Sequence, residues 1–226
     1  MQGEVLAIDG ETIIGAKVNG ASPIHMVSAW ACKSNLVLGQ QKVREKSNEI
    51  TPIPNLIEAL ALGGTTVTID AMGCQTEIAQ KIIDAQANYV LAVKGNQPEL
   101  LENIEDEFRF NKIRGTSVDV DYGHGRIETR VCTVISDFIH MQNIQKWVGM
   151  KSVGRIESIR EFKATGQKQT ATRYYITSLN KPAQKLQCVV RNHWAIENKL
   201  YWSLEVAFNE DHNRKRKGNA SQNFSL

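Results

Sequence analysis

The stretch TTVTIDAMGCQTEIAQKIIDAQANYVLAV, residues 65–93, decides the fold of this 226-residue chain. It begins with the β-branched run Thr65–Ile69 and ends with a second apolar run, Tyr89–Val93. Between them, from Gln75 to Ala87, apolar residues recur at helical spacing. A strand, a helix and a strand joined by short connections favour two parallel strands with the helix packed on the sheet. The stretch therefore predicts an α/β fold.

On the N-terminal side of this unit, three strands are predicted, at Val5–Ile8, Ile24–Cys32 and Leu36–Val43. A hairpin turn at Lys33–Asn35 is expected to join the last two. Pro52 opens an amphipathic helix before the central unit, and Pro98 opens an acidic helix after it.

Beyond residue 116 the sequence becomes β-rich, and a helix closes it. Strands are predicted at Thr129–Ser136, Ser152–Phe162 and Thr172–Thr177, with turns around Tyr122–Gly125 and Thr165-Gly166. A final helix is predicted from Pro182 past Trp202. We therefore expect a mixed sheet flanked by helices, with a core formed by residues 1–112 and 179–226. Residues 113–178 would form a β-rich insertion before the last helix.

The composition is that of an ordinary globular protein, with 42% hydrophobic and 23% charged residues. It excludes the collagen-like, disordered and disulfide-scaffold classes. No apolar run approaches the roughly 18 residues that a membrane span requires, and the N-terminal sequence has no signal-peptide pattern. We therefore expect a cytoplasmic protein with no membrane partner. The net charge of +3 leans only weakly toward an anionic partner.

The cysteines give no sign of a metal or redox site. Cys32, Cys74, Cys132 and Cys188 are far apart, and none belongs to a C-x-x-C pair. We expect four reduced thiols that pack as small hydrophobic side chains.

Two aspartates stand out because each follows an apolar run, Asp9 in LAIDG and Asp70 in VTIDAMG. A carboxylate at such a position is displayed at the carboxyl edge of the sheet, where open α/β proteins bind ligands. Two ionised groups placed together are costly without partners, and a divalent cation removes that cost. The alternative is local: Asp70 could cap the helix after Gly73, and Asp9 could form a turn with Gly10.

A third acidic candidate is Glu197, in the segment RNHWAIENKLYW. At helical spacing its neighbours are His193 and Tyr201, so we expect the glutamate to lie partly buried on an aromatic-rich face. The alternative is an exposed glutamate that pairs with Lys199 or Arg191.

Several segments of the chain resemble insertion-sequence transposases of the H-repeat-associated group. These segments are IDGETIIGAK (8–17), the stretch from residue 68 to 100, GHGRIETR (123–130), RYYITSL (173–179) and the region from residue 191 to 220. The group belongs to the class that carries a DDE triad on a ribonuclease-H-like core. The resemblance implies that Asp9, Asp70 and Glu197 are the triad, brought together because the first and fourth strands are neighbours in such a sheet.

The resemblance also implies an activity, metal-dependent DNA strand cleavage and strand transfer in transposition. Two divalent cations held about 3.5–4 Å apart stabilise the attacking and leaving oxygens in such reactions, and acidic side chains suit magnesium or manganese. The expected partner is DNA, as transposon ends and as target. The resemblance leaves room for a homodimer in a synaptic complex.

Basic side chains near these motifs are candidates for binding DNA phosphates. Arginine suits bidentate phosphate contact, and basic runs neutralise phosphates in a salt-sensitive way. A histidine contact would weaken on deprotonation around the reference pKa of roughly 6.5. The candidates are Lys94, His124, Arg126, Arg130, Arg191, His193, Arg214, Lys215, Arg216 and Lys217. The alternative for the Arg126 region is an exposed charged hairpin with Glu128, and for Arg214–Lys217 a solvated tail.

The chain departs from the family pattern in two ways. Glu11 and Ile14 stand where the family has a lysine and an arginine. Family members also extend further at both ends, so we interpret the chain as truncated. One alternative is therefore a catalytically inactive remnant that retains only DNA binding. Another is an α/β phosphohydrolase with Asp9 or Asp70 as its nucleophile.

Overall fold

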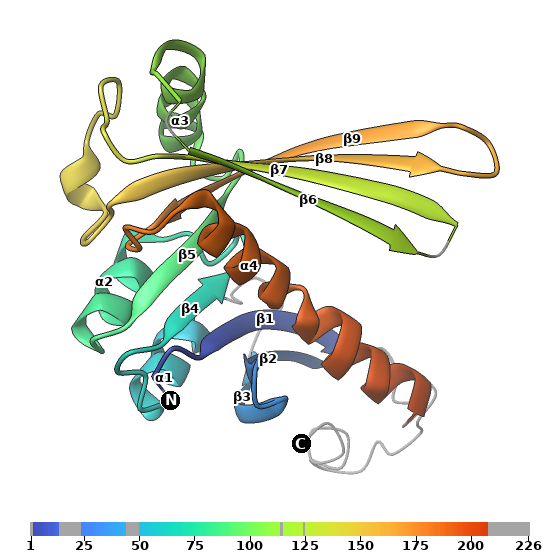
Figure 1. Ribbon diagram of the computed structural model, residues 1–226. Coiled ribbons are helices and arrows are strands. Elements are labelled where there is room, and N and C mark those ends of the chain that lie inside the picture. Colours follow the sequence, from blue (N-terminus) through green and yellow to red (C-terminus); the bar gives the residue numbers. More distant parts are fainter. Residues whose placement is uncertain (1, 14–23, 44–49, 114, 124, 208–226) are drawn as a thin grey trace.

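The computed structural model describes residues 2–13, 24–43, 50–113, 115–123 and 125–207. Within them, one nine-stranded sheet has the order β3-β2-β1-β4-β5-β9-β8-β7-β6 (Figure 1). Its strands are β1 (Val5–Ile13), β2 (Ile24–Ala31), β3 (Leu36–Val43), β4 (Thr66–Ile69), β5 (Asn88–Val93), β6 (Gly115–Gly123), β7 (Arg126–Ile135), β8 (Ser152–Phe162) and β9 (Lys168–Thr177).

The central strands form the sheet that the sequence predicted. β1 pairs in parallel with β4, and β4 with β5, whereas β2 runs antiparallel to β1 and to β3. The predicted hairpin turn between β2 and β3 is present, with Asn35 at a positive φ of 52°. The order β3-β2-β1-β4-β5 is that of a ribonuclease-H-like sheet, and it confirms the expected fold class.

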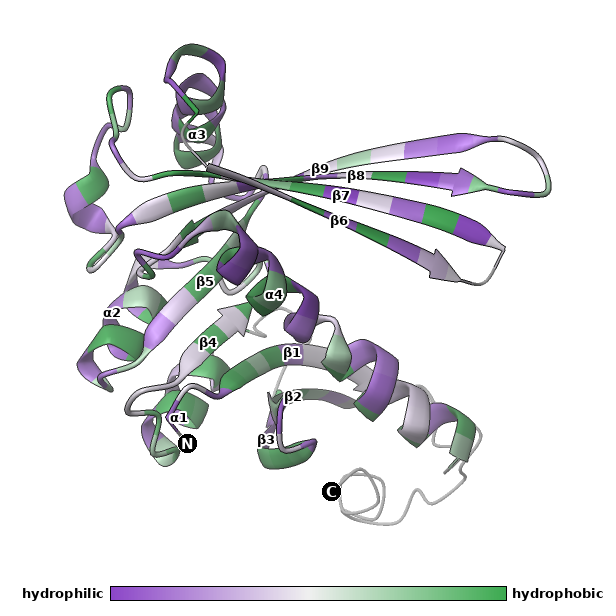
Figure 2. Ribbon diagram, in the orientation of Figure 1, coloured by the Kyte–Doolittle hydropathy of each residue, from purple (hydrophilic) through white to green (hydrophobic). Residues whose placement is uncertain are grey.

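The two faces of the sheet are covered by different helices. α1 (Pro52–Ala59), α2 (Thr76–Asp84) and α3 (Pro98–Phe110) bury apolar side chains against one face. α4 (Ala183–His193) covers the other. Alternation along the buried strands explains the division: Leu6 and Ile8 belong to the first cluster, and Val5 and Ala7 to the second. Figure 2 shows the apolar residues concentrated on these strands and on the facing sides of the helices.

Beyond α4 the chain winds more widely than an α-helix. It continues as two π-helical segments, η3 (Ile196–Tyr201) and η4 (Ser203–Ala207). A short 3₁₀ segment, η2 (Ile144–Lys146), lies between β7 and β8. π-helical turns are rare and frequently lie at functional sites.

Strands β6–β9 form a long antiparallel ribbon that projects from the core (Figure 1). β8 has the predicted bounds, and β7 and β9 begin earlier than expected. β6 is a strand that the sequence analysis missed, because its apolar residues, such as Val118 and Val120, are exposed at the sheet edge and resemble a solvated segment.

The ribbon continues the core sheet without interruption. Near its carboxyl end, β9 pairs with β5 on one side and with β8 on the other. The proposed division at residues 113–178 therefore stays a prediction.

The cysteines are buried with one exception among the four. Cys32, Cys74 and Cys132 are buried thiols, as predicted, but Cys188 is exposed on α4. Burial raises the pKa of both the Cys74 and the Cys132 thiol to about 12, so neither is a ready nucleophile.

Among the described residues, no helix is long and apolar enough to cross a membrane.

Candidate functional site

The strand register places Asp9 beside Asp70. The last parallel pair between β1 and β4 joins Ile8 to Ile69, and each aspartate is the next residue. Neighbouring strands are about 4.8 Å apart. Ala7 and Thr68, which lie two residues before Asp9 and Asp70, face α4. Every second residue of a strand lies on the same face, so both aspartate side chains are expected on the α4 face.

The surroundings of Asp9 differ from the prediction in one respect. The strand does not end there but continues to Ile13, paired with β2 alone. Because β4 stops at Ile69, the central sheet opens at this point, and Asp9 is half-buried at the opening rather than in a turn.

Glu197 reaches the same place from the other end of the sequence. Asp9, Asp70 and Glu197 line one cavity of about 140 Å³ between the sheet and the helix, which we call the acidic cavity. Its other walls include Thr68, Ala71, Val90, Lys94, Arg173, Tyr175, His193 and Trp194. The structure thus brings together three acidic residues separated by 61 and 127 positions in the sequence.

Glu197 is exposed, although its sequence neighbours predicted partial burial. The reason is that η3 packs along β1, beyond the end of β4, where the sheet no longer covers the helix. Tyr201 fixes this segment, because its hydroxyl donates a hydrogen bond to the carbonyl oxygen of Asp9 at 3.0 Å. The alternative pairing with Arg191 or Lys199 is not formed: Arg191 pairs with Asp119, and Lys199 donates to Asn35.

Local hydrogen bonds orient Asp70. Its Oδ1 accepts bonds from the backbone amides of Met72 at 3.1 Å and Gly73 at 3.4 Å. Asp70 thus forms a local turn and does not cap α2, whose N-cap is Gln75 and has no side-chain cap hydrogen bond. The turn occupies only one of the two carboxylate oxygens of Asp70 in these bonds.

The acidic residues shift the pKa values of neighbouring groups. Loss of hydration beside the cavity wall raises the pKa of Glu197, although its side chain is largely exposed; Arg173 lowers this pKa and Asp70 raises it. Burial also raises the pKa of the Tyr201 phenol, and Asp9 adds to that effect. The cavity therefore concentrates negative charge, which favours a cationic occupant.

The chemistry of this donor set fits a hard divalent cation. Carboxylate oxygens are the ligands that magnesium and manganese prefer. In the described part of the chain, no three His, Cys, Asp or Glu side chains stand close enough together to hold an ion. The carboxylates of Asp9, Asp70 and Glu197 thus share a cavity without converging, as expected for like charges.

His193 is placed differently from the prediction of a titrating phosphate contact. Its Nδ1 lies 2.9 Å from the hydroxyl of Thr68 on β4. Burial lowers the pKa of His193 to about 4 and outweighs Asp70 and the hydrogen bond to Thr68, which both raise it. The imidazole is therefore neutral at pH 7 and can offer DNA a hydrogen bond, not a positive charge.

Lys94 and Arg173 add positive charge on the other side of the acidic cavity. Lys94 is the residue after β5 and lies on the same face as Ala92. The last pair between β5 and β9 is Val93–Tyr174, so Arg173 lies opposite Lys94 one residue further along. Arg173, in the segment RYYITSL, was not among the predicted DNA-binding residues. The sequence could have indicated it, because Arg173 lies two residues before the buried Tyr175 in the same strand and therefore on the same face.

The predicted arginines of the ribbon form an ion-pair network. Glu128 is buried, contrary to the exposed-hairpin alternative, and its carboxylate lies 2.8 Å from Arg130 and 4.0 Å from Arg126. Arg191 of α4 bridges to Asp119 and Asp121 of β6. Both arginines of β7 and Arg191 therefore face one another between the ribbon and α4.

The remaining candidates fall outside the described residues. These are His124, Arg214, Lys215, Arg216 and Lys217.

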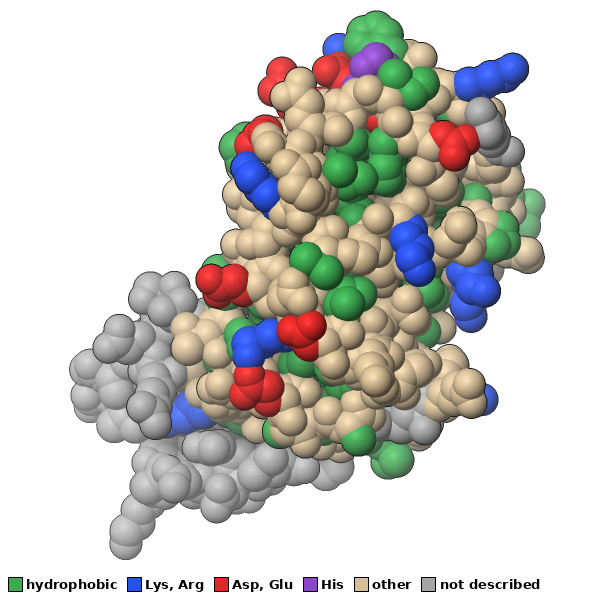
Figure 3. Space-filling model, turned by 90° about the vertical axis from the view of Figure 1, so that its left-hand side faces the viewer, with side chains coloured by type: hydrophobic (Ala, Val, Ile, Leu, Met, Phe, Trp, Pro, Cys, Tyr) green, Lys and Arg blue, Asp and Glu red, His purple; other side chains and the backbone are tan. Residues whose placement is uncertain are grey.

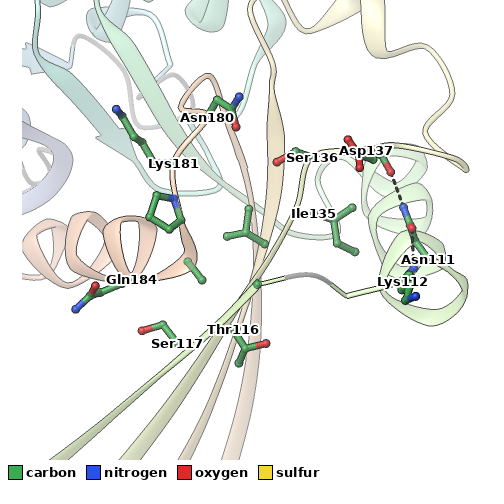
Figure 4. A pocket seen from close by; sticks show the side chains of 14 residues that line it. Asn111, Lys112, Thr116, Ser117, Ile135, Ser136, Asp137, Asn180, Lys181 and Gln184 are labelled. Atoms are coloured by element: carbon green, nitrogen blue, oxygen red, sulfur yellow. Dashed lines mark hydrogen bonds between the residues drawn. The ribbon is translucent and has the colours of Figure 1, made fainter.

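A further cavity does not contain Asp9, Asp70 or Glu197. It has a volume of about 640 Å³ and lies at the foot of the ribbon, between the starts of β6 and α4. Figure 4 shows Asn111 bonding across its edge to the backbone of Asp137, with Lys181 and Gln184 on the opposite wall. Its lining lacks a cluster of acids among the described residues, so its size alone assigns it no chemistry.

Another face of the molecule gives a useful contrast. Figure 3 shows acidic and basic side chains interspersed there, with no accumulation of one sign. The positive charges near the acidic cavity belong to a separate grouping between the ribbon and α4.

Comparison with known proteins identifies relatives over nearly the whole chain. A family model described as "Transposase DDE domain" matches residues 2–226. The "Putative transposase YncI" of Escherichia coli O157:H7 is 42% identical over 233 aligned positions, covering 99% of this chain and 59% of the relative. The "H repeat-associated putative transposase YhhI" of Escherichia coli K12 is 40% identical, covering 98% and 61%. The chain thus spans about 60% of the length of these relatives.

Proposed function

This chain belongs to the transposase DDE domain family, and from that membership we propose that it catalyses metal-dependent DNA strand cleavage and strand transfer. Asp9, Asp70 and Glu197 would hold two magnesium or manganese ions. The observation that carries the proposal is that these three acidic residues, distant in sequence, line one cavity of about 140 Å³.

Divalent cations bound there would stabilise negative charge on the attacking and leaving oxygens of a phosphodiester. The rest of the site orients the substrate. Asp9 and Asp70 are fixed by the sheet, and the turn at Gly73 holds one oxygen of Asp70. Glu197, on the π-helical segment, must swing inward to complete the ligand set, and its exposure leaves room for that movement.

Positive and polar groups around the acidic cavity would contact the DNA backbone. Lys94 lines the acidic cavity itself, and neutral His193 can donate from its ring. Arg126, Arg130 and Arg191 lie further along the same side of the sheet. Residues Arg214–Lys217, and a homodimer that pairs two transposon ends, complete the proposal.

Strand nicking tests the function directly. The chain is incubated with DNA carrying the element's ends, with magnesium or manganese, and Asp70→Asn serves as the comparison. We expect nicking that requires the cation and disappears in Asp70→Asn. Nicking that survives the substitution would overturn the metal assignment.

The inactive-remnant alternative predicts a different result in the same assay. Both proteins would then bind the DNA equally and neither would nick it, with either cation. A DNA-binding measurement on each preparation separates this outcome from a failure to fold.

A further inference from the structure

A row of polar side chains crosses three strands and ends beside the acidic cavity. Gln40 of β3 lies opposite Ser28 of β2, and Ser28 lies opposite Asp9 of β1. Side chains at directly opposed positions lie on the same side of a sheet, and Tyr201 of η3 meets the row at Asp9. We call Gln40, Ser28 and Tyr201 the polar row.

Hydrogen bonds run along the polar row in one direction. The Nε2 atom of Gln40 donates to the Ser28 hydroxyl at 3.0 Å. The Ser28 hydroxyl bonds in turn to the phenolic oxygen of Tyr201, and the Tyr201 hydroxyl donates to the carbonyl oxygen of Asp9 at 3.0 Å. Each hydroxyl thus accepts one hydrogen bond and donates one, and the members of such a chain strengthen one another.

The last bond of the row acts where the backbone of β1 loses a neighbour. β4 ends at Ile69, so Asp9 is the first residue of β1 beyond the last pair with β4. Gly10 follows, and glycine restricts the backbone less than any other residue. Because the peptide bond is planar, the Tyr201 hydroxyl fixes the orientation of the whole peptide group between Asp9 and Gly10.

The same bond fixes the segment that carries Glu197. Ile196 and Leu200 of η3 are buried in the apolar cluster below α4, but apolar burial is non-directional and sets no exact position along β1. A hydrogen bond is directional. Residues four apart lie on the same face of a helix, so the bond between Tyr201 and Asp9 sets the face of η3, and with it Glu197, that is directed toward the sheet.

We propose that Tyr201 is a positioning residue for metal binding, and that the polar row holds Asp9 and Glu197 at the separation that a divalent cation requires. The inference rests on the proposed function for the identity of the cation. Tyr201 acts through the Asp9 carbonyl and through the turn of η3, without touching the metal. Mutation of such outer partners of metal ligands typically costs about 10–100-fold in metal affinity.

Manganese binding by the protein alone tests this role without any cleavage. Free Mn²⁺ is measured by electron paramagnetic resonance while the folded chain is titrated in the absence of DNA. Tyr201→Phe removes one oxygen and keeps the ring, and it should weaken manganese binding about 10-fold or more. Equal affinities of Tyr201→Phe and the parent would overturn the inference and leave the proposed function intact. A parent that binds no manganese would refute the proposed metal site itself, and the positioning role with it.

Tyr89→Phe is the matched control. Tyr89 of β5 is fully buried in the cluster on the opposite face of the sheet, and its hydroxyl has no hydrogen-bond partner among the described residues. Loss of that hydroxyl should leave the manganese affinity unchanged. Urea unfolding shows that both variants are folded, and an equal loss of affinity in the two variants would contradict the positioning role.

Hydrogen exchange of the η3 backbone amides gives a second readout, taken on the metal-free protein. Tyr201→Phe should exchange the amides of residues 196–201 faster than the parent, because the directional contact with β1 is lost. Tyr89→Phe should exchange them at the parent's rate. If exchange in η3 is the same in all three proteins, the hydroxyl does not hold the segment and the inference is wrong.

Discussion

A cavity of about 570 Å³ between the ribbon and the helix formed by α4 and η3 adjoins the acidic cavity; we call it the arginine groove, because Arg126, Arg130, Arg160, Arg173 and Arg191 line it. The two cavities share Arg173, Trp194 and Glu197, yet they arrange charge in opposite ways. In the acidic cavity, carboxylates from three distant segments lie together without converging. In the arginine groove, a buried carboxylate is surrounded by arginines within 4.0 Å. In the acidic cavity, Lys94 and Arg173 offset only two of the three carboxylates, so negative charge is in excess. In the groove, Glu128, Asp119 and Asp121 pair with the four arginines 126, 130, 160 and 191, so positive charge is in excess.

The largest expected effect separates the two regions by catalysis. Asp9→Asn should reduce strand nicking by more than about 100-fold, because even the outer partners of metal ligands are worth about 10–100-fold. Asp119→Asn, the same change beside Arg130 and Arg191 in the ribbon, should leave the nicking rate within a few-fold. Both are measured at saturating DNA, and similar losses would contradict the division of roles.

Glu128→Gln tests the internal balance of the groove. Removing the charge of a buried, ion-paired carboxylate leaves three arginines around a neutral acceptor, so the free energy of unfolding should fall by about 3 kcal/mol. Urea titration measures the change. The control is Glu157→Gln, which removes the ion pair between the exposed Glu157 and the partly buried Arg155 and should cost about 1 kcal/mol or less. A Glu128→Gln protein as stable as the control would show that Glu128 does not organise the arginines.

A second buried carboxylate, Glu107 of α3, lies in neither region and sharpens the comparison. Its Oε1 accepts hydrogen bonds from the backbone amides of residues 139–141, and its Oε2 accepts one from Asn111. Burial raises the pKa of Glu107, but these hydrogen bonds outweigh burial and the net pKa is lowered. Glu107→Gln should therefore cost about 2 kcal/mol of unfolding free energy at pH 7.

The pH dependence of that cost has a definite sign. A carboxyl whose pKa is lowered by folding stabilises the protein above its ordinary value of 4.5. The stabilisation is lost as the pH falls from there toward the folded pKa. Urea titrations at pH 7 and pH 3.5 should show the gap between Glu107→Gln and the parent narrowing at the lower pH, and a widening gap would refute the assignment.

The smallest expected effect concerns His193. Because burial lowers the pKa of His193 to about 4, its charge is constant between about pH 5.5 and 8. The parent and His193→Gln should then show the same pH profile of DNA affinity in that window. A decline in binding around pH 6.5 that only the parent shows would mean that the imidazole is more accessible than its contact with Thr68 implies.

Local patterns predicted much of the core correctly. The β-branched run at Thr66–Ile69 and the helical spacing from Thr76 to Asp84 each form the expected element. These periodicities are properties of a few adjacent residues, so they can be read directly from the chain. Beyond Ile8 the strand continued to Ile13, because pairing with β2 does not depend on the burial that marked the strand in the sequence.

The arginine groove could not be predicted in this way. Arg160 and Arg173 lie in segments that read as ordinary exposed strands, and their common direction depends on the registers of β7, β8 and β9. The burial of Glu128 and the π-helical winding at Glu197 likewise arise from packing against α4 and β1.

The sequence by itself determined the α/β core, the neighbouring first and fourth strands through the family resemblance, and the three acidic candidates. It could do so because side-chain periodicity and short motifs are local. Only the tertiary structure decided which charges meet: the carboxylates in one cavity, the arginines in the adjoining groove, and His193 buried against Thr68. Those neighbours come from segments up to 188 positions apart, and burial of apolar faces between sheet and helix is the force that brings them together.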